Sequence, residues 1–339
     1  MQTTITFFPR RAWAVARVAA LLAVAVGCLN AALAQQPDEV ARAAHFSLDP
    51  RALYRAASSV AVPDGAIAAV LEEDERYSFD AQGRMTHTGH YIYKILTEKG
   101  AEAWDAISVD WAPWHEARPV IRARVITPDF AVHTLDAGSI TELPARDGDY
   151  KIYSDGKILH APLPAIAPGV VVEEEFVETE TEPLFAAGRA VRVQLGNEQV
   201  PVGASRVVIE APESMPLRTA TVHMEGIEAV RSVQHGRVSL VYDKGRTEGI
   251  DPAEPLLPHD VTRYPEVRFS TAKSWQALAS EYARIVEAHM DTAAVRSVVA
   301  RATAGKATAA DKERALVDVM DREVRSTETR LSDKYCAFT

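Results

Sequence analysis

Apolar and polar residues alternate with a period of two along much of residues 66–243, which predicts β-strands. The pattern is clearest in residues 120–127, where three apolar residues share one face and two arginines the other: Ile121, Ala123 and Val125 against Arg122 and Arg124. Pro128-Asp129 predicts a turn, and a strand returns over residues 131–135. Further strands are predicted at residues 91–96, 170–177, 191–195, 207–209 and 230–242, the last folding back at residues 234–236. Many short strands indicate a mainly β fold, an antiparallel β-sandwich-like domain.

The period becomes helical after residue 270. Ser274 is a predicted N-cap, and the helix that follows carries an apolar stripe: Trp275, Leu278, Tyr282, Ile285, Val286 and His289. A second helix over residues 295–302 is closed by Gly305, and a third begins at Thr308 with Asp311 three residues later. A short α-helical segment therefore follows the β-domain.

These patterns divide the chain into five segments. Residues 1–34 are a predicted signal peptide, and residues 35–65 a lead-in with one short helix. Residues 66–245 form the β-sandwich-like domain, and residues 246–269 a linker whose prolines disfavour helix and central strand. Residues 270–339 form the helical segment.

The first 34 residues have the three parts of a secretory signal. A basic region with Arg10, Arg11 and Arg17 precedes the apolar run of residues 18–29, and Ala32-Leu33-Ala34 forms a small-x-small cleavage site. The run of about 12 residues is too short to cross a hydrocarbon core of about 30 Å as a helix. We expect cleavage before Gln35 and a periplasmic or secreted protein.

A second interpretation of the same region involves Cys28. Small residues precede it, as at a lipoprotein cleavage site, so a lipid on Cys28 would hold the chain at the outer membrane. We expect a membrane partner only in that case.

Charge excludes one class of partner. Removal of the three signal arginines leaves 34 basic and 47 acidic residues, a net charge of −13. Nucleic acid is therefore not an expected partner, because phosphate contacts need clustered Lys and Arg. Cys28 and Cys336 are the two cysteines, so no internal disulfide is expected once the signal has gone.

Candidate catalytic and metal-binding residues are few. Cys336 could be a nucleophile, but no downstream His and Asp follow it in the sequence to activate it. His87 and His90, with His115, could bind a metal. Positions three apart on a strand point to opposite faces, so the pair converges only if Thr88-Gly89 forms a bulge. Two half-exposed histidines are the expectation.

Two acidic runs and one aromatic group complete the candidates. Residues 72–75 and 173–175 could bind calcium or act as acid and base, but they lack the interleaved Asp, Asn and Gly of calcium loops. We expect solvated strand edges instead. The aromatic group could be a carbohydrate or peptide platform, although sandwich core is favoured because two of its tyrosines share a strand face; its members are Tyr91, Tyr93, Trp104, Trp111 and Trp114.

Three stretches carry a family resemblance. The first is YIYKILTEKGAEAW (residues 91–104) followed by RARVITPD (122–129), the second is LPAIAPG (163–169), and the third is YPEV (264–267) with Ser270, Ser274 and Trp275. In this order they resemble bacterial extracytoplasmic proteins with the "domain of unknown function 3857", which a transglutaminase-like domain normally follows. The resemblance covers residues 50–330.

The resemblance implies that residues 308–325 are the first helix of a transglutaminase-like α+β core. A Tyr-Gly-Asp-Cys-Lys-type motif with the nucleophile follows later in that family. Tyr335-Cys336 is similar to it only in part, because Gly, Asp and the basic residue are missing and the sequence stops at Thr339. A truncated or frameshifted chain is the expectation.

The functional expectation is an exported non-catalytic module that binds an unknown protein, peptide or glycan beside a transglutaminase-like cysteine-hydrolase domain. No catalytic, cofactor-binding or metal-binding residue is assigned, and no cofactor is expected. The alternative is a transglutaminase-like thiol peptidase or acyl transferase whose catalytic half is missing from the sequence. A lipid-anchored scaffold, which depends on Cys28, is the third possibility.

Overall fold

The computed structural model describes residues 44–145, 155–251, 256–258, 261–289 and 292–324. Its helices are α2 (Pro50–Ser58), α3 (Glu98–Ala103), η1 (Ala137–Ser139), α4 (Trp275–His289), α5 (Thr292–Thr303) and α6 (Ala309–Glu323). Its strands are β1 (Ala68–Phe79), β2 (Met85–Ile95), β3 (Ala106–Trp111), β4 (Val120–Ile126), β5 (Val132–Thr134), β6 (Thr141–Pro144), β7 (Lys157–Pro162), β8 (Val171–Thr179), β9 (Ala190–Gln194), β10 (Val202–Pro212), β11 (Arg218–Val222), β12 (Val230–Gln234), β13 (Arg237–Lys244) and β14 (Glu266–Ser270). We call the strands together the β-body.

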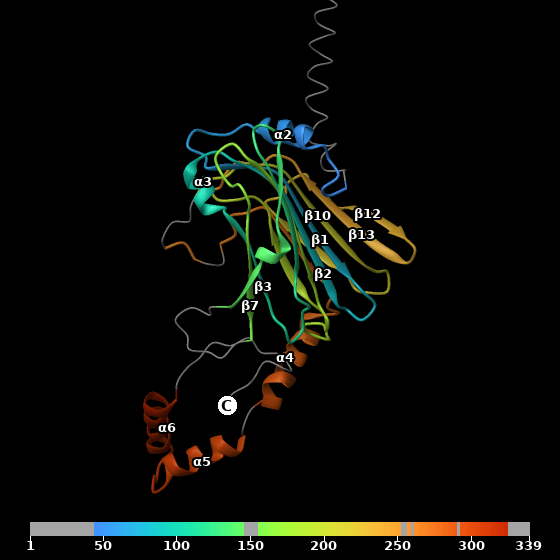
Figure 1. Ribbon diagram of the computed structural model, residues 1–339. Coiled ribbons are helices and arrows are strands. Elements are labelled where there is room, and N and C mark those ends of the chain that lie inside the picture. Colours follow the sequence, from blue (N-terminus) through green and yellow to red (C-terminus); the bar gives the residue numbers. More distant parts are fainter. Residues whose placement is uncertain (1–43, 146–154, 252–255, 259–260, 290–291, 325–339) are drawn as a thin grey trace, which may run out of the picture.

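One large sheet forms the centre of the β-body (Figure 1). Its strand order is β12-β13-β10-β1-β2-β8-β4-β5, and every pair is antiparallel except β1 with β10. Two three-stranded antiparallel sheets, β3-β7-β6 and β11-β14-β9, accompany it. The long strands β1 and β2 therefore lie in the middle of the sheet, where their side chains are covered most completely.

Both small sheets pack on the same face of the large sheet, which we call the inner face. One buried cluster joins β3 and β7 to β2, β4 and β8, and a second joins β9 and β14 to β1, β10 and β13. A third cluster lies on the opposite, outer face, where α2 buries Leu53 against Leu71, Ile92 and Ile126. Two packed layers with helices outside confirm the mainly β, sandwich-like fold.

Local sequence explains the elements that frame these layers. Asp49 caps α2, because its carboxylate accepts hydrogen bonds from the backbone amides of Arg51 and Ala52, and Pro50 occupies the first turn. The predicted reversal in residues 234–236 is a two-residue turn in which His235 and Gly236 have φ values of 52° and 73°. Two positive φ angles are typical of the type I′ turns that join antiparallel strands.

The predicted helices also form. The Ser274 hydroxyl accepts a hydrogen bond from the amide of Ala277, and the Thr308 hydroxyl accepts one from the amide of Asp311. α2 and α3 lie at one end of the β-body, while α4 leaves the other end toward α5 and α6 (Figure 1). Within the described residues, no helix has the length and apolarity to cross a membrane.

The apolar stripe of α4 is covered only in part. Ile285 is fully buried, whereas Trp275 and Tyr282 are exposed. Two backbone amides of the loop after β8, those of Ala186 and Ala187, donate hydrogen bonds of 2.9 and 2.5 Å to the Glu281 carboxylate. These contacts attach α4 to the β-body.

The predicted linker ends earlier than the sequence indicates. Residues 266–269, which the sequence assigns to the linker, lie in β14, the central strand of its small sheet. The last of the linker prolines, Pro265, directly precedes this strand. The signal peptide, Cys28 and Cys336 lie outside the described residues.

Candidate functional site: an acidic aromatic pocket

A cavity of about 260 Å³ opens on the inner face of the large sheet, beside the end of α3. We call it the acidic aromatic pocket, and its lining residues are Val70, Glu73, Tyr91, Tyr93, Ala103, Trp104, Ala106, Glu174 and Asn197. Three aromatic side chains and two carboxylates therefore share one small space. Among the described residues that line it, none is Lys, Arg or His.

Strand register places the two acids on either side of a tyrosine. Tyr91 of β2 lies opposite Glu73 of β1 and also opposite Glu174 of β8. Tyr93 lies two residues further along β2 and hence on the same face. The floor of the pocket therefore belongs to three central strands, whose positions the ladder hydrogen bonds fix.

Trp104 reaches the pocket from the end of α3. The Thr97 hydroxyl caps this helix by accepting the amide of Gly100, and the Trp104 amide donates to the Gly100 carbonyl. A Cβ atom on Gly100 would lie 2.2 Å from the Ile67 carbonyl oxygen, so glycine permits the helix to approach β1 this closely. The Trp104 ring then packs edge-on against Tyr93, with 4.7 Å between centroids and 83° between planes.

The two pocket carboxylates have only neutral hydrogen-bond donors. Glu174 Oε2 accepts a 2.7 Å bond from the Tyr93 hydroxyl, and burial raises the pKa of Glu174 to about 7. Glu73 Oε2 accepts bonds from the Ser205 hydroxyl (2.8 Å) and the Gly196 amide (3.1 Å). Burial raises the pKa of Glu73 as well, although these two bonds oppose the shift.

The two acids that flank Glu174 on β8, in contrast, lie beside cationic side chains. Glu173 and Glu175 point to the outer face, where Arg124 binds Glu173 and Arg122 binds Glu175. Burial acts to raise the pKa of Glu173, but hydrogen bonds from His90 and from the Phe46 amide, together with Arg124, hold it below its usual value. The pKa values of consecutive acids on β8 are therefore shifted in opposite directions. The two outer-face acids have cationic partners, whereas the inner-face acid has none among the described residues.

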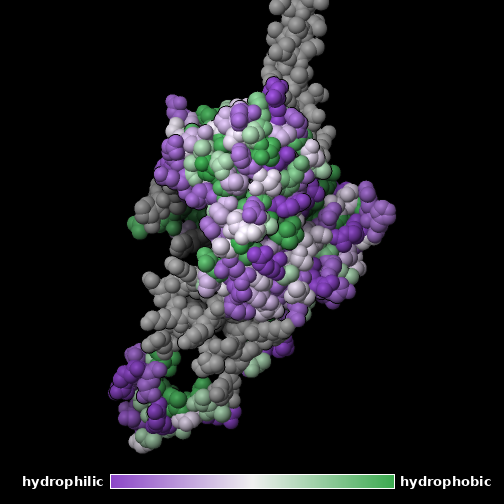
Figure 2. Space-filling model, in the orientation of Figure 1, coloured by the Kyte–Doolittle hydropathy of each residue, from purple (hydrophilic) through white to green (hydrophobic). Residues whose placement is uncertain are grey.

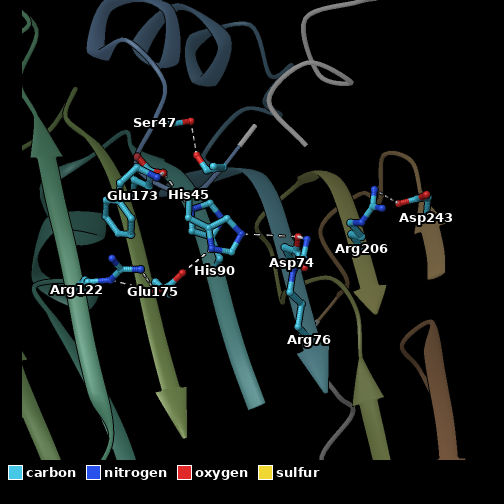
Figure 3. Close-up of polar contacts among 12 residues, drawn as sticks. His45, Ser47, Asp74, Arg76, His90, Arg122, Glu173, Glu175, Arg206 and Asp243 are labelled. Atoms are coloured by element: carbon cyan, nitrogen blue, oxygen red, sulfur yellow. Dashed lines mark hydrogen bonds and ion pairs between the residues drawn. The ribbon is translucent and has the colours of Figure 1, made fainter. Parts of the chain in front are cut away.

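On the outer face, charged residues form a row across six strands, which we call the charge ladder (Figure 3). The register places six residues of alternating type side by side: Asp243, Arg206, Asp74, His90, Glu175 and Arg122. The ends are closed by ion pairs, Arg206 to Asp243 at 3.1 Å and Arg122 Nε to Glu175 at 3.0 Å. Because acidic and basic residues alternate along the row, each carboxylate within it lies beside an arginine or a histidine.

Residues 45–48, which we call the strap, cross the charge ladder. His45 Nδ1 lies 2.5 Å from Glu175 Oε2, and His45 Nε2 lies 3.9 Å from Asp74 Oδ2 (Figure 3). The Phe46 amide donates a 2.7 Å bond to Glu173, and Arg124 donates a 3.0 Å bond to the Leu48 carbonyl. The strap therefore packs on the outer face of the large sheet.

The prediction that the two acidic runs are solvated strand edges is wrong. Both runs lie on central strands, and most of their carboxylates are buried: Glu72, Glu73, Asp74, Glu75, Glu173 and Glu175. Their partners come from distant strands and from the strap, so local sequence does not reveal them. Alternation along each run is the signal that could have found the pocket, because it sends Glu73 and Glu174 inward.

The histidines do not form the metal pair. The register is continuous through Thr88 and Gly89, so His87 points to the inner face and His90 to the outer face. His90 is buried rather than half-exposed, and His115 lies near Glu116 and Glu180 instead. Within the described residues, no group of three or more His, Cys, Asp or Glu side chains could hold a metal ion.

His87 belongs to a second inner-face cavity of about 210 Å³, which includes Glu116, Glu180 and Arg189. His87 Nε2 lies 2.5 Å from Glu75 Oε2, and His87 Nδ1 lies 2.7 Å from Glu178 Oε2. Burial alone would lower the pKa of His87, but the hydrogen bonds to Glu178 and Glu75 raise it to about 9. Because this cavity already holds its own cations, its carboxylates are compensated.

The aromatic group divides between core and pocket. Tyr93 is a member of the first buried cluster, and Tyr91, Trp104 and Trp111 pack against it, as the sequence predicts. The Lys157 ammonium lies over the Trp111 ring, 5.5 Å from its centroid, and Trp111 is not among the residues that line the pocket. Trp114 packs on His115, with 4.0 Å between centroids.

Comparison with solved structures shows a shared fold. A protein from Parabacteroides distasonis ATCC 8503, described as a candidate protease, superposes with a TM-score of 0.67 at 14% identity over 75% of this chain. This chain spans 50% of that protein. A candidate nutrient-binding protein from Legionella pneumophila gives a TM-score of 0.31 at 9% identity, covering 79% of this chain and 84% of that protein. No curated protein matches the sequence.

The family resemblance is confirmed for the middle of the chain. The matched segment includes the pocket residues on β2, α3, β3 and β8, whereas Val70 and Glu73 precede it. Residues 81–245 match the family described as "Domain of Unknown Function with solved-structure structure (DUF3857)".

Proposed function

We propose that this chain is an exported, non-catalytic binding module and that the acidic aromatic pocket is its ligand site. The observation that carries the proposal is the pocket itself, a concave site with aromatic walls. It also holds the buried Glu73 and the half-buried Glu174, and neither carboxylate has a cationic partner among the described residues. Small-molecule sites commonly combine apolar walls with a few convergent polar groups, and perturbed acids mark functional positions. A site on central strands is also held rigidly.

The module is proposed to work beside a transglutaminase-like cysteine-hydrolase domain. The resemblance in residues 264–275 and 308–325 supports this arrangement. The fold shared with the Parabacteroides protein is compatible with it, because half of that longer protein lies outside the match. At 14% identity the likeness shows the fold alone, so the catalytic neighbour is part of the proposal.

The alternative is a transglutaminase-like thiol peptidase or acyl transferase. Its support is the partial likeness of Tyr335-Cys336 to the nucleophile motif. The coding sequence after Thr339 distinguishes the two, since the enzyme needs a Cys, a His and an Asp there. An activity on glutaminyl or peptide substrates that disappears in Cys336→Ala would also favour the enzyme.

Export is proposed on the signal in residues 1–34. N-terminal sequencing of protein recovered from the extracytoplasmic fraction should begin at Gln35. A start at a lipid-modified Cys28 would instead support the membrane-anchored scaffold, while an intact Met1 would argue against export.

Binding is tested by titrating the purified chain with three classes of compound: short neutral peptides, amino sugars and alkyl amines. Ligand-observed NMR should detect saturable binding of at least one class, and Trp104→Ala should abolish it. Trp111→Ala is the matched control, because Trp111 packs against the same cluster but does not line the pocket. Binding by no class, or binding that survives Trp104→Ala, would overturn the proposal.

A further inference from the structure

We propose that the acidic aromatic pocket binds a protonated amine, such as the ammonium group of a lysine-type side chain. This inference rests on the proposed binding function and names its ligand class. It follows from three properties of the pocket, which are its uncompensated charge, its aromatic walls and its hydrogen-bonding inventory.

The charge argument begins with Glu73 and Glu174. They flank Tyr91 on neighbouring strands, and the described residues form no ion pair with either carboxylate. Burying a carboxylate without a cation is costly, and elsewhere the same sheet avoids that cost with arginine or histidine, as at Glu173 and Glu175. A ligand cation would supply the missing partner in the pocket.

The aromatic walls suit the same ligand. Tyr91, Tyr93 and Trp104 surround the space, and the negative faces of such rings attract an ammonium group within about 6 Å. Aromatic rings combined with carboxylates form the cages that proteins use for alkylammonium groups. The apolar edges of the rings would also contact the methylene groups next to the charge.

The hydrogen-bond acceptors that line the pocket favour an amine over a sugar as its ligand. The Tyr93 hydroxyl already donates to Glu174, and the Tyr91 hydroxyl donates to Glu75, so both hydroxyl hydrogens are engaged. The carboxylate and hydroxyl oxygens that remain are acceptors, and the lining also has two donors, the Trp104 indole N–H and the Asn197 side-chain amide. An ammonium group has three donors and no acceptor, so it matches the oxygens around the two carboxylates.

The size of the cavity points to a single side chain. Its volume of about 260 Å³ is below the range of about 300–1,000 Å³ that is typical of drug-sized ligands. An ammonium group with its alkyl stem fits inside it, and the rest of the ligand would lie outside.

The proton on Glu174 gives the site a recognisable pH signature. Because burial raises the pKa of Glu174 to about 7, the empty pocket is partly protonated at neutral pH. A cation binds the ionised carboxylate better, so affinity should rise between about pH 6 and pH 8. It should then stay level until the amine itself loses its proton near its ordinary pKa of about 10.4.

The test uses Nα-acetyl-L-lysine methylamide and its Nε-acetylated counterpart, which has the same stem but no charge. Isothermal titration or NMR at pH 8 should detect binding of the first and none of the second. Glu174→Gln should weaken binding at least tenfold and reduce its pH dependence between about pH 6 and pH 8, and Glu73→Gln should also weaken binding. Glu142→Gln is the control for net charge, because Glu142 pairs with Lys157 on β7, outside the pocket lining.

Four outcomes would count against the inference. Equal binding of the acetylated probe would show that charge is not recognised. Binding of N-acetylglucosamine in the pocket without binding of the amine would leave the binding function intact and overturn the ligand class. Failure of peptides, sugars and amines alike would overturn the proposed function itself. An unchanged affinity in both Glu174→Gln and Glu73→Gln would place the amine elsewhere.

Discussion

The imidazole rings of His45 and His90 lie face to face, with 3.8 Å between their centroids and 3° between their planes. His45 belongs to the strap and His90 to β2, so the stack joins the lead-in segment to the central sheet. Carboxylates surround the stack, because Glu175 contacts His45 and Glu173 contacts His90. The carboxylates of Asp74 and Glu175, which face the two ring nitrogens, raise the pKa of His45, although burial opposes this shift.

His45→Ala should loosen the strap. The substitution removes a charge-assisted contact and one half of the stack, so we expect the free energy of unfolding to fall by about 1–3 kcal/mol. Trypsin should also cut faster at Arg51 and Arg55 of α2, which mass spectrometry would detect. His133→Ala on the exposed edge strand β5 is the control and should change neither measurement. Unchanged cleavage in His45→Ala would show that the strap is held mainly by α2.

Arg124 and Arg122 provide a matched pair for the charge ladder. Each binds one carboxylate of β8, but the Arg124 side chain is 12% exposed and the Arg122 side chain 58% exposed. Arg124→Ala leaves Glu173 buried with a reduced set of partners, so we expect a loss of about 3 kcal/mol. Arg122→Ala should cost less than about 1 kcal/mol, because the Arg122 side chain is largely exposed and His45 still contacts Glu175 in the variant. Equal losses in urea denaturation would mean that burial does not control these pairs.

Stability should decline from mildly acidic to alkaline pH. Burial raises the pKa of Glu72 and of Glu174 to about 7, so the folded state holds their protons more tightly than the unfolded state. Their favourable contribution is complete below about pH 4.5 and is lost as the pH rises to about 7. The raised pKa of His87, about 9, adds stability that is complete below about pH 6.5 and lost by about pH 9. Asp74, Glu173 and Glu175 have lowered pKa values and lose their contribution in acid.

Urea titrations between pH 4 and pH 9.5 would measure this profile. We expect a maximum near pH 5 and a steady fall above it. His87→Gln should flatten the fall between about pH 6.5 and pH 9 by at most about 3 kcal/mol, the value that corresponds to the full shift. A profile that rises toward pH 9 would contradict the charge assignments of both faces.

Gly89 should not tolerate a side chain. A Cβ atom there would lie 2.5 Å from two ring atoms of Phe176 on β8. The Gly89→Ala substitution therefore forces the ring to move, and we expect a loss of about 1–3 kcal/mol in urea denaturation. The double variant with Phe176→Leu should recover part of this loss, because the shorter side chain frees the space. Additive losses in the double variant would show that the ring is not the obstacle.

Local patterns predicted the parts of this fold that depend on neighbours in sequence. The alternation in residues 120–126, the turn at His235-Gly236 and the caps at Ser274 and Thr308 all appear where expected. The parallel pairing of β1 with β10 did not follow from the sequence, because the partners are more than a hundred residues apart. The acidic residues 72–75 also hid the central position of β1. In the sequence they look like solvent-exposed charges, because their partners lie on distant parts of the chain.

The candidate site shows the same division. The sequence identified Tyr91, Tyr93 and Trp104 as an aromatic group, and β2 and α3 bring them to one pocket. Their relation to Glu73 and Glu174 depends on register across three strands, which single-sequence patterns do not define. The fold class and the aromatic side chains of the pocket could therefore be predicted from the sequence. The position of the two carboxylates beside those side chains could not.

The attachment of α4 suggests where limited proteolysis will separate the chain. Two hydrogen bonds to Glu281 tie α4 to the loop after β8, whereas α5 and α6 contact mainly each other and expose Val295, Val299 and Met320. Figure 2 shows hydrophilic and hydrophobic residues interspersed over the visible face of the β-body. A two-helix unit with exposed apolar residues has little core of its own, and small units of this kind are rarely stable alone.

Trypsin should therefore cut first beyond α4, at Arg301 or Lys306, and leave a β-rich fragment that retains α4. Because β14 pairs on both sides with other strands, cleavage before residue 266 should not release the C-terminal part until the β-body unfolds. Glu281→Ala removes the acceptor for two loop amides and should add cuts within α4, which intact-mass analysis over time would detect. Arg314→Ala leaves these contacts unchanged and serves as the control. Digestion of the β-body before α5 and α6 would contradict the division of the chain proposed from its sequence.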